Sequence, residues 1–501
     1  MCGICGIWGS RDDTLLETMM DGLSHRGPDA SGVHTSNIGA LGHRRLSIMD
    51  LEHGNQPIYN EDNTKAIISN GEIYNFPKLY IELSKRHLFS TKNDSEAILH
   101  LYEEHGVDVV NYLDGMFAFC IADGDSIFLA RDYIGIKPIY YTIDKNGTLY
   151  FSSELKSMNS LKGDVREFPP GTWYHSDIGF KSFYEVPDLR PQDTSYQEHT
   201  TNLRKTFENS VVKRLMSDVP LGAFLSGGLD SSLIAAVARR HMNSLHTFCV
   251  GIEGSRDIES ARMTAEHIDS VHHEYIITAE EVLEKLPEII FHLESFDQDL
   301  VRSAIPCYFT SRLASDFVKV ILTGEGADEL FGGYTYYKDI TDKEILHREL
   351  RRSVNSLHNI NLQRLDRMTM AHSIEGRVPF LDAKMIELAQ IIPPKWKLWG
   401  NPPVEKWILR KTFEDLLPEE IIWRKKEQFD EGSGTVNLLS EAIPKIIKPE
   451  QAETYRQQHQ SVLLRSSEEC YYHQIFSKIF SNAEHILKNV GRWSERPELI
   501  S

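Results

Sequence analysis

The first 185 residues alternate short apolar runs with turn residues, a pattern typical of β-strands. The apolar runs lie at residues 65–68, 116–122, 126–130, 138–141 and 149–152. Two stretches, near residues 12–25 and 95–105, read as helices that interrupt these strands. Strands and helices arranged in this way predict a layered α+β architecture for the first part of the chain.

A polar, proline-containing stretch at residues 186–195 is typical of a linker between domains. Beyond it, residues 197–217 predict a helix, and residues 221–225 predict a buried strand that leads through a glycine turn into another helix. Strand-like runs at 247–250 and 318–322 each follow a helix. Strands that alternate with helices predict a parallel sheet, and the last 150 residues read as helices and loops.

Composition and charge narrow the possible partners. The 501 residues are 41% hydrophobic and 25% charged, as in globular proteins, and the length predicts about two to four domains. With 54 basic and 73 acidic residues the net charge is −19, which argues against nucleic acid or an anionic membrane as the main partner. We find no apolar run near the roughly 18 residues of a membrane span and no secretory signal pattern. Six scattered cysteines predict reduced thiols and a cytoplasmic location.

The N-terminus offers a nucleophile. If the initiator methionine is removed, Cys2 carries an α-amine with an ordinary pKa of about 7.7–8.0, which can accept the thiol proton. Asn70 and Gly71 end a strand-like run, and an amide beside a glycine N–H can form an oxyanion hole. Arg45 and Asp94 could bind the carboxylate and the amine of an amino acid. A cysteine at position 2 is usually incidental, Asp94 also suits a helix N-cap, and Arg45 could be a surface charge.

Residues 226–232, Ser-Gly-Gly-Leu-Asp-Ser-Ser, follow the strand at 221–225 and open a helix. Glycines let backbone N–H groups approach an anion, and a helix N-terminus favours negative charge. The segment matches neither the P-loop nor the dinucleotide fingerprint. A carboxylate here, Asp230, is compatible with bound phosphate if a cation such as Mg²⁺ bridges them. The alternative is a simple turn between strand and helix.

A second acidic loop, residues 322–333, follows the strand at 318–322, at the edge where open parallel sheets bind ligands. Asp328 is a second candidate Mg²⁺ ligand, and Glu325 could act as a base or position a substrate; the alternative is a flexible acidic loop. Lys406 could stabilise charge during acyl or phosphoryl transfer, although by itself its segment reads as one turn of an amphipathic helix.

These segments together resemble one family. Residues 1–6, 25–29, 45–48, 70–75, 94, 115–119 and 131–132 resemble a class II glutamine amidotransferase domain. Residues 226–232, 324–334, 377–382, 405–410 and 423–429 resemble the synthetase domain of glutamine-hydrolysing asparagine synthetases. The likeness runs in family order from residue 2 to about residue 480, and so many segments in order are highly specific.

The resemblance implies an αββα sandwich of the N-terminal nucleophile type at residues 2–188. It implies an α/β parallel-sheet domain of the ATP pyrophosphatase type, with a helical C-terminal part, at residues 196–490. Cys2 would hydrolyse glutamine, with Asn70 and Gly71 holding the oxyanion, and ammonia would cross an internal tunnel. ATP would activate a carboxylate, that of aspartate in this family, as an acyl-adenylate and release pyrophosphate. The ammonia would then attack the activated carboxylate. The family also implies a homodimer.

The resemblance assigns roles residue by residue. The glutamine-binding positions are Arg45, Leu46, Ser47, Ile48, Met49, Asn70, Gly71, Glu72 and Asp94. The ATP-binding positions are Leu225, Ser226, Gly227, Gly228, Asp230, Ser231, Ser232, Val250, Thr323 and Gly324. Asp230 and Asp328 match Mg²⁺ positions, and Glu325 and Lys406 match residues tied to the adenylate.

One segment departs from the family pattern. Bacterial and animal asparagine synthetases tend to carry a Tyr-Asp-x-Thr-Thr-x-Arg segment near the acceptor pocket, whereas residues 296–302 here read Phe-Asp-Gln-Asp-Leu-Val-Arg. Asp299 and Leu300 replace two hydroxyls, and Arg302 is kept. Asp299 could repel a carboxylate of aspartate or hold its α-amine. The alternatives are the same mechanism on another small carboxylic acid, a β-lactam-forming relative, which the intact Cys2 disfavours, and a non-catalytic regulatory or scaffold homologue.

Overall fold

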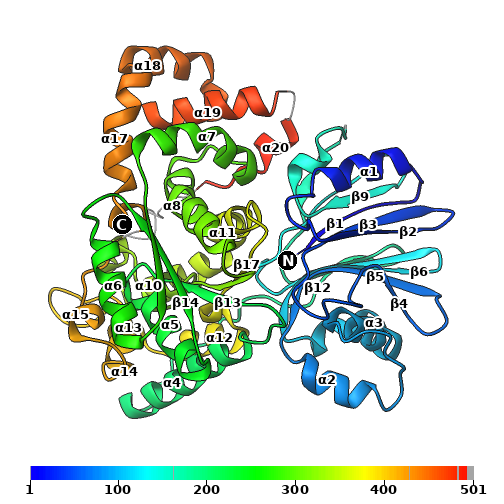
Figure 1. Ribbon diagram of the computed structural model, residues 1–501, viewed down its shortest axis with the longest axis horizontal. Helices are drawn as coiled ribbons and strands as arrows, with labels where there is room; N and C mark the ends of the chain where they lie inside the picture. The colour runs from blue at the N-terminus through cyan, green and yellow to red at the C-terminus, as the bar shows by residue number, and fades with distance from the viewer. Residues whose placement is uncertain (1, 162, 428, 482–483, 493–501) are drawn as a thin grey trace.

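The N-terminal part of the chain forms two six-stranded antiparallel sheets, drawn in blue and cyan in Figure 1. The computed structural model describes residues 2–161, 163–427, 429–481 and 484–492. Met1 and Gln428, which belong to segments quoted above, lie outside the described residues.

The two sheets face each other across a buried apolar layer. In spatial order the first comprises β10 (Arg166–Glu167), β8 (Tyr140–Ile143), β9 (Leu149–Ser152), β1 (Gly3–Trp8), β3 (Gly39–Arg45) and β2 (Ala30–Thr35). The second comprises β12 (Gly179–Ser182), β11 (Thr172–His175), β7 (Ser126–Arg131), β6 (Gly115–Asp123), β5 (Lys65–Ile73) and β4 (Ile58–Tyr59). Ile4 and Phe151 from the first sheet pack with Ile68 and Leu129 from the second.

Helices cover the two outer faces of this sandwich. α1 (Asp13–Asp21) packs on β1 and β3, and α2 (Phe76–Leu83) and α3 (Asp94–His105) lie over the second sheet (Figure 1). On that side Ile98 and Leu101 of α3 pack in one cluster with Phe117 of β6. Because β6 is covered on both faces, its residues are buried almost without exception, which explains their continuous apolar run. The αββα layering expected for this part is confirmed.

Five parallel strands form the centre of the second part, in the order β15 (Val271–Ile276), β14 (His246–Gly251), β13 (Leu221–Phe224), β16 (Val320–Leu322) and β17 (Glu375–Arg377). In Figure 1, α8 and α11 lie above these strands, and α4, α5 and α12 lie below them. The parallel α/β sheet and the helical C-terminal part are therefore confirmed.

The helices of the second part are α4 (Tyr196–Lys213), α5 (Leu229–His241), α6 (Arg256–Ile268), α7 (Ala279–Leu293), α8 (Gln298–Ser315), α9 (Ala327–Phe331), α10 (Lys343–Asn355), α11 (Asn361–Met370), α12 (Ala383–Ile391), α13 (Pro394–Lys397), α14 (Trp407–Thr412), α15 (Glu419–Ile422), α16 (Phe429–Gly432), α17 (Thr435–Ile446), α18 (Pro449–Gln458), α19 (Ser467–Ile479) and α20 (Glu484–Lys488). Among the described residues, none of the helices has the length and apolar character that crossing a membrane requires.

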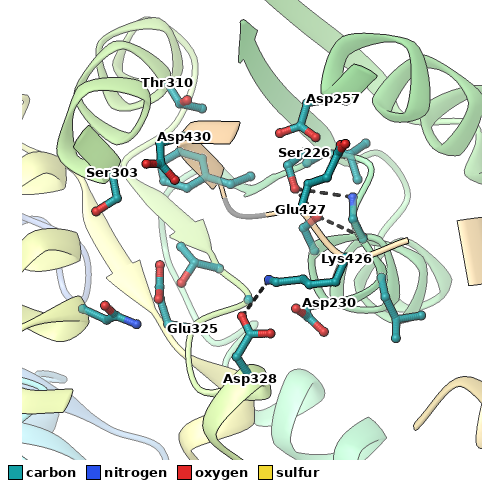
Figure 2. A pocket seen from close by; sticks show the side chains of 18 of the residues that line it. Ser226, Asp230, Asp257, Ser303, Thr310, Glu325, Asp328, Lys426, Glu427 and Asp430 are labelled. Carbon is teal, nitrogen blue, oxygen red and sulfur yellow. Dashed lines mark hydrogen bonds and ion pairs between the residues drawn. The ribbon is translucent and has the colours of Figure 1, made fainter. Parts of the chain in front are cut away.

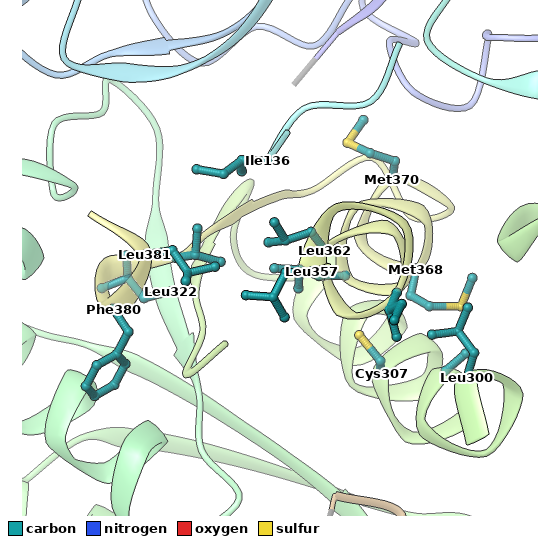
Figure 3. Packing of buried hydrophobic residues seen from close by; sticks show 14 of the residues in the cluster. Ile136, Leu300, Cys307, Leu322, Leu357, Leu362, Met368, Met370, Phe380 and Leu381 are labelled. Carbon is teal, nitrogen blue, oxygen red and sulfur yellow. The ribbon is translucent and has the colours of Figure 1, made fainter. Parts of the chain in front are cut away.

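Apolar side chains continue from the first part of the chain into the second. Figure 3 shows Ile136, from the segment between β7 and β8, near Leu362 and Met370 of α11. Ile136 is 4% exposed and Met370 is fully buried, so both side chains are shielded from solvent. The two parts of the chain therefore share one apolar core at their contact.

Candidate active sites

Cys2 lies in a small pocket of about 330 Å³, including space open to solvent, at the junction of the two parts. Its walls are Cys2, Arg45, Leu46, Ile48, Met49, Gln56, Ser69, Gly71, Glu72, Asn93, Asp94, Ser95 and Glu375. Most of the expected glutamine-binding residues are therefore together. Ser47 and Asn70 are not part of this lining. The Ser47 N–H donates to Asp29 Oδ2 at 2.8 Å, and Asn70 is hydrogen-bonded to Cys2.

Asn70 is bonded directly to the candidate nucleophile. Its Oδ1 accepts a hydrogen bond from the backbone nitrogen of Cys2 at 2.9 Å. Its buried Nδ2 has no hydrogen-bond partner among the described residues, so it is a donor available to a ligand in this pocket. A Cβ at Gly71 would lie 2.1 Å from Met116 O, so only glycine allows this close approach of the two strands.

The Cys2 thiol is buried, and its Sγ lies 3.9 Å from Leu46 O. Burial raises the pKa of the Cys2 thiol, while the positive N-terminus and Arg45 act in the opposite direction. The thiol is therefore neutral at rest and needs a base before it can act as a nucleophile.

Arg45 and Asp94 both line the pocket, and each is bonded to backbone groups. Arg45 Nη2 donates to Met49 O at 3.1 Å and to Asp50 O at 2.6 Å. Asp94 Oδ2 accepts from the Ile73 N–H at 2.6 Å. The N-cap interpretation of Asp94 is wrong, because Asn93 caps α3 and Asp94 is its first residue. Burial raises the pKa of Asp94 to about 6.

Glu375, which was not singled out from the sequence, is the residue that the second part of the chain contributes to this pocket. Glu375 Oε1 accepts from Arg377 Nε at 2.6 Å, and Arg377 Nη2 lies 3.5 Å from Glu72 Oε2. Burial opposes ionisation of Glu375, but Arg377 outweighs it and lowers the pKa of Glu375 to about 2. The pKa of Glu72 is instead raised, by burial and by the negative charge of Glu375. The pocket is complete only when the two parts are in contact.

A larger cleft, of about 1410 Å³ including space open to solvent, lies at the carboxyl ends of β13, β14 and β16 (Figure 2). Open parallel sheets bind ligands at this edge. The expected residues that line the cleft are Leu225, Ser226, Gly228, Asp230, Ser231, Val250, Thr323, Gly324, Glu325, Asp328 and Lys406. Gly227 and Ser232 do not line it; Gly227 makes the turn at φ +67°, and Ser232 is buried against Thr264.

The loop before α5 is suited to an anion. Gly228 is the N-cap of α5 and makes no side-chain cap, which leaves the first N–H groups of the helix available. Ser226 Oγ lies 3.4 Å from the Gly228 nitrogen and 3.2 Å from Ser231 Oγ, so it fixes the shape of the turn.

Lys406 joins the two candidate metal ligands. Its Nζ lies 2.5 Å from Asp230 Oδ2 and 2.6 Å from Asp328 Oδ1. Lys426 Nζ lies 2.8 Å from Asp328 Oδ2, as Figure 2 shows. Lys406 is 1% exposed, so it does not belong to a solvated helix face. Despite burial, the two lysines hold the pKa of Asp328 well below its usual range.

The Asp230 and Asp328 carboxylates fit a Mg²⁺ site. Asp230 Oδ1 is buried and has no hydrogen-bond partner among the described residues. Carboxylate oxygens together with phosphate oxygens are the ligands that Mg²⁺ prefers. The remaining expected residue, Glu325, is ion-paired with Arg364 of α11, another cleft residue.

The segment at residues 296–302, which departs from the family pattern, leads into α8. Asp299 and Leu300 line the cleft, but Arg302 does not; it binds both oxygens of Glu468 at 2.8 and 2.7 Å. Asp299 Oδ2 lies 3.2 Å from Arg465 Nη1, and the same guanidinium also pairs with Asp297 and Glu469. Further cleft residues, Arg364, Arg424 and Lys426, were missed as individual residues, although the basic run 424–426 signalled a site for negative charge.

A buried ion-pair network connects the two sites. Arg26 Nε donates to Cys2 O at 3.0 Å, and Arg26 Nη1 lies 2.6 Å from Glu154 Oε1. The same guanidinium binds Asp366 of α11. Since α11 also carries Arg364, the partner of Glu325, this helix lines the larger cleft and is joined to Cys2 through Arg26.

Comparisons with known proteins agree with this geometry. The glutamine amidotransferase domain family matches residues 1–174, and the asparagine synthase family matches residues 202–346 and 338–496. A glutamine-hydrolysing asparagine synthetase of Arabidopsis thaliana is 41% identical over 459 residues, which cover 87% of this chain and 79% of the relative. One from Zea mays is 39% identical over 507 residues, which cover 96% and 86%. The chain belongs to the glutamine-hydrolysing asparagine synthetase family.

Two solved structures align with parts of this family member. An allosteric regulatory enzyme of purine biosynthesis aligns at 19% identity over 50% of this chain and 66% of its own, with a TM-score of 0.34. An ammonia-dependent NAD synthetase of Campylobacter jejuni aligns at 13% identity over 54% and 94%, with a TM-score of 0.25. At these TM-scores the fold assignment rests on the sheets described above.

Proposed function

We propose that this chain is a glutamine-dependent asparagine synthetase. It hydrolyses glutamine at Cys2 and uses the ammonia to amidate a carboxylate that ATP activates as an acyl-adenylate. The observation that carries the proposal is the coexistence of the Cys2–Asn70 pocket and the Lys406–Asp230–Asp328 cleft in one member of this family. A silent scaffold would have no need of either set of buried polar groups.

In the first site, removal of Met1 makes the Cys2 nitrogen an α-amine. That amine takes the thiol proton, and the thiolate attacks the glutamine amide. Asn70 Nδ2 and the Gly71 N–H stabilise the oxyanion, which is consistent with the free, buried Nδ2. Arg45 binds the α-carboxylate of glutamine and Asp94 its α-amine.

Ammonia then crosses to the second site. The apolar contact between the two parts, which includes Ile136 and Met370, supports this route, because an apolar path disfavours protonation of ammonia (Figure 3).

In the second site, the loop at residues 226–232 binds the ATP phosphates. Asp230 and Asp328 would hold Mg²⁺, which would neutralise and orient the phosphates when bound. Lys406 offsets the negative charge of the departing pyrophosphate, and its position between two carboxylates supports that role. Glu325, held by Arg364, orients or deprotonates the incoming ammonia.

Aspartate is the proposed acceptor. Asp299 lies on the cleft wall beside Arg465, which it shares with Asp297 and Glu469, and it can accept a hydrogen bond from the α-ammonium group of aspartate. The second candidate function is amidation of another small carboxylic acid. Asp299 and Leu300 favour it, because they replace the two hydroxyls of the family pattern at this wall.

The test is pyrophosphate release with ATP, Mg²⁺ and glutamine, measured with aspartate and with a panel of small carboxylic acids. The proposal predicts release with aspartate at the highest kcat/KM of the panel. A higher kcat/KM with another acid would establish the second function, and no release with any acid would overturn both.

We also propose that the enzyme is a cytoplasmic homodimer. The six cysteines are free and buried, which supports a reducing compartment. Light scattering in solution would give twice the 57.4 kDa of one chain if the dimer is correct, and 57.4 kDa if it is not.

A further inference from the structure

Two histidines and two glutamates converge on the outer layer of the N-terminal part, away from both clefts. Glu61 follows β4, His87 follows α2, and His100 and Glu103 lie on α3 (Figure 1). One ligand-type atom from each of the four lies within 4.8 Å of the other three. We refer to these four residues as the histidine–glutamate cluster; none of them lines either site described above.

The N–O distances within the cluster are near the ligand–ligand spacing of a tetrahedral metal site, and two of them are also hydrogen-bond distances. His87 Nδ1 lies 3.2 Å from Glu61 Oε1 and 3.7 Å from Glu103 Oε2. His100 Nδ1 lies 3.7 Å from Glu61 Oε2 and 2.9 Å from Glu103 Oε2. Ligands bound tetrahedrally at about 2.0–2.1 Å are about 3.3–3.4 Å apart, and these four separations fall on both sides of that value.

The other nitrogen of each imidazole faces a carboxylate. His87 Nε2 lies 3.2 Å from Glu104 Oε1, and His100 Nε2 lies 3.6 Å from Glu96 Oε1. Histidines that bind a metal through one ring nitrogen usually have a carboxylate or carbonyl at the other, which fixes the tautomer. His87 therefore has an outer carboxylate within hydrogen-bond distance, and His100 has one slightly farther away.

The burial of His100 and the hydrogen bonds that hold Glu61 and Glu103 in place are also consistent with a metal site. The His100 side chain is fully buried. Asn60 Nδ2 donates to Glu103 Oε1 at 2.8 Å, which leaves Oε2 directed at His100 Nδ1. The Leu88 N–H donates to Glu61 Oε1 at 3.0 Å.

We propose that the histidine–glutamate cluster binds one Zn²⁺ ion as a structural site. Two neutral imidazoles and two carboxylates form a tetrahedral set whose charge balances a divalent cation, and imidazole ligands favour Zn²⁺ over Mg²⁺ or Ca²⁺. The ion ties the turn at Glu61 and the loop at His87 to α3. Because α3 begins at Asp94, the ion would stiffen one wall of the Cys2 pocket without touching it.

The competing interpretation is a metal-free ion-pair network, in which protonated histidines neutralise the surrounding carboxylates. The charged groups that face the two imidazoles are Glu61, Glu96, Glu103 and Glu104, and Arg86 pairs with Glu104. A metal site and an ion-pair network differ in one respect that can be measured directly, the binding of Zn²⁺.

The experiment uses the full-length enzyme after chelator treatment and titrates it with Zn²⁺ against a chromophoric chelator. We expect one tight site per chain, lost or weakened at least tenfold in His87→Ala and Glu61→Gln. Their side chains are 14% and 32% exposed, so both variants should fold. The control is His53→Ala, at a position 70% exposed and outside the cluster, which should bind Zn²⁺ like the wild type.

Two further readouts keep the result independent of activity. Co²⁺ in place of Zn²⁺ should give the intense visible absorption of a tetrahedral site in the wild type and not in His87→Ala. Zn²⁺ should raise the melting temperature of the wild type but not of His87→Ala. Equal Zn²⁺ binding by wild type and both variants, or no binding by the wild type at micromolar Zn²⁺, would overturn the proposal and leave the proposed synthetase activity unaffected.

Discussion

Arg26 and Asp366 form a buried bidentate ion pair across the junction of the two parts, with N–O distances of 2.7 and 3.0 Å. The same Arg26 donates to the carbonyl of Cys2, so the nucleophile is connected to α11 by two consecutive interactions. Removing one partner of a buried ion pair typically costs about 3–5 kcal/mol, because the other charge is left unpaired. The junction should therefore affect both the stability of the enzyme and the coupling of its two activities.

Asp366→Asn should lower the melting temperature and uncouple the two sites. The substitution keeps the shape of the side chain but removes the charge that pairs with Arg26. We expect more glutamine to be hydrolysed per amide formed, with ammonia-dependent synthesis reduced less than glutamine-dependent synthesis. The control is Asp164→Asn, which breaks an exposed pair with Arg166 and should change little. An equal reduction of both syntheses in Asp366→Asn would contradict the coupling.

Cys2→Ala should abolish glutamine hydrolysis and leave synthesis from ammonium salts, since only the first site needs a thiolate. Steady-state assays with glutamine and with ammonium chloride separate the two. Cys5→Ala, a buried cysteine on β1 outside the pocket, is the matched control and should retain hydrolysis. Hydrolysis at the wild-type rate in Cys2→Ala would show that another residue is the nucleophile.

Asp230→Asn and Asp328→Asn should each lower synthesis by about 10²–10³, or about 2.7–4 kcal/mol, the usual cost of one catalytic electrostatic contact. Glutamine hydrolysis should remain measurable, because neither residue lines the Cys2 pocket. Rates are compared at saturating ATP with increasing Mg²⁺. Asp316→Asn, an exposed position after α8, is the control. Normal synthesis in both Asp230→Asn and Asp328→Asn would rule out their role in holding the metal.

Lys406→Met should suppress formation of the adenylate, whereas Glu325→Gln should permit some adenylate and stop amide formation. Transfer of ¹⁸O from the acceptor carboxylate to AMP distinguishes these outcomes, because it requires the adenylate. Lys411→Met tests a half-buried lysine of α14, the helix that begins after Lys406, and should behave like the wild type within about 0.5 kcal/mol. A near-normal rate in Lys406→Met would mean that the adenylate needs no cation at this position.

Glutamine binding should weaken in acid because of Asp94. Burial raises the pKa of Asp94 to about 6, so below that pH the carboxyl is protonated and its attraction for the α-ammonium group of glutamine is lost. In the Cys2→Ala background, which removes the chemistry, calorimetry should show Kd rising about tenfold per pH unit below about pH 6. Adding Asp94→Asn should give weaker binding that no longer varies with pH over this range. A flat profile with Asp94 intact would contradict its role.

Much of the fold could be predicted from local pattern, and the exceptions have physical reasons. β6 and β7 were evident because both faces of the sheet are covered and the residues are apolar throughout. β1 was missed because its glycines lower strand propensity; a Cβ at Gly6 would lie 2.4 Å from the Phe151 ring, so packing requires glycine there. β15 was missed because it is a polar edge strand, Val-His-His-Glu-Tyr-Ile.

The candidate sites show a similar division. Residues in short distinctive segments, such as Asn70 and Asp230, could be singled out because the residues next to them in the sequence indicate their function. Glu375 and Arg364 could not, because only the folded chain brings β17 to the Cys2 pocket and α11 to the cleft. Arg302, which is kept from the family pattern, binds Glu468 and does not line the cleft, so likeness to the family pattern alone does not place a residue at the site.

The most direct test of the proposed function follows the amide nitrogen. The enzyme is supplied with amide-¹⁵N glutamine, ATP, Mg²⁺ and aspartate, and the products are identified by mass spectrometry and ³¹P NMR. We predict asparagine labelled in its amide group, with AMP and pyrophosphate formed in equal amounts to it. Labelled ammonia without labelled asparagine, or ADP and phosphate in place of AMP and pyrophosphate, would contradict the account.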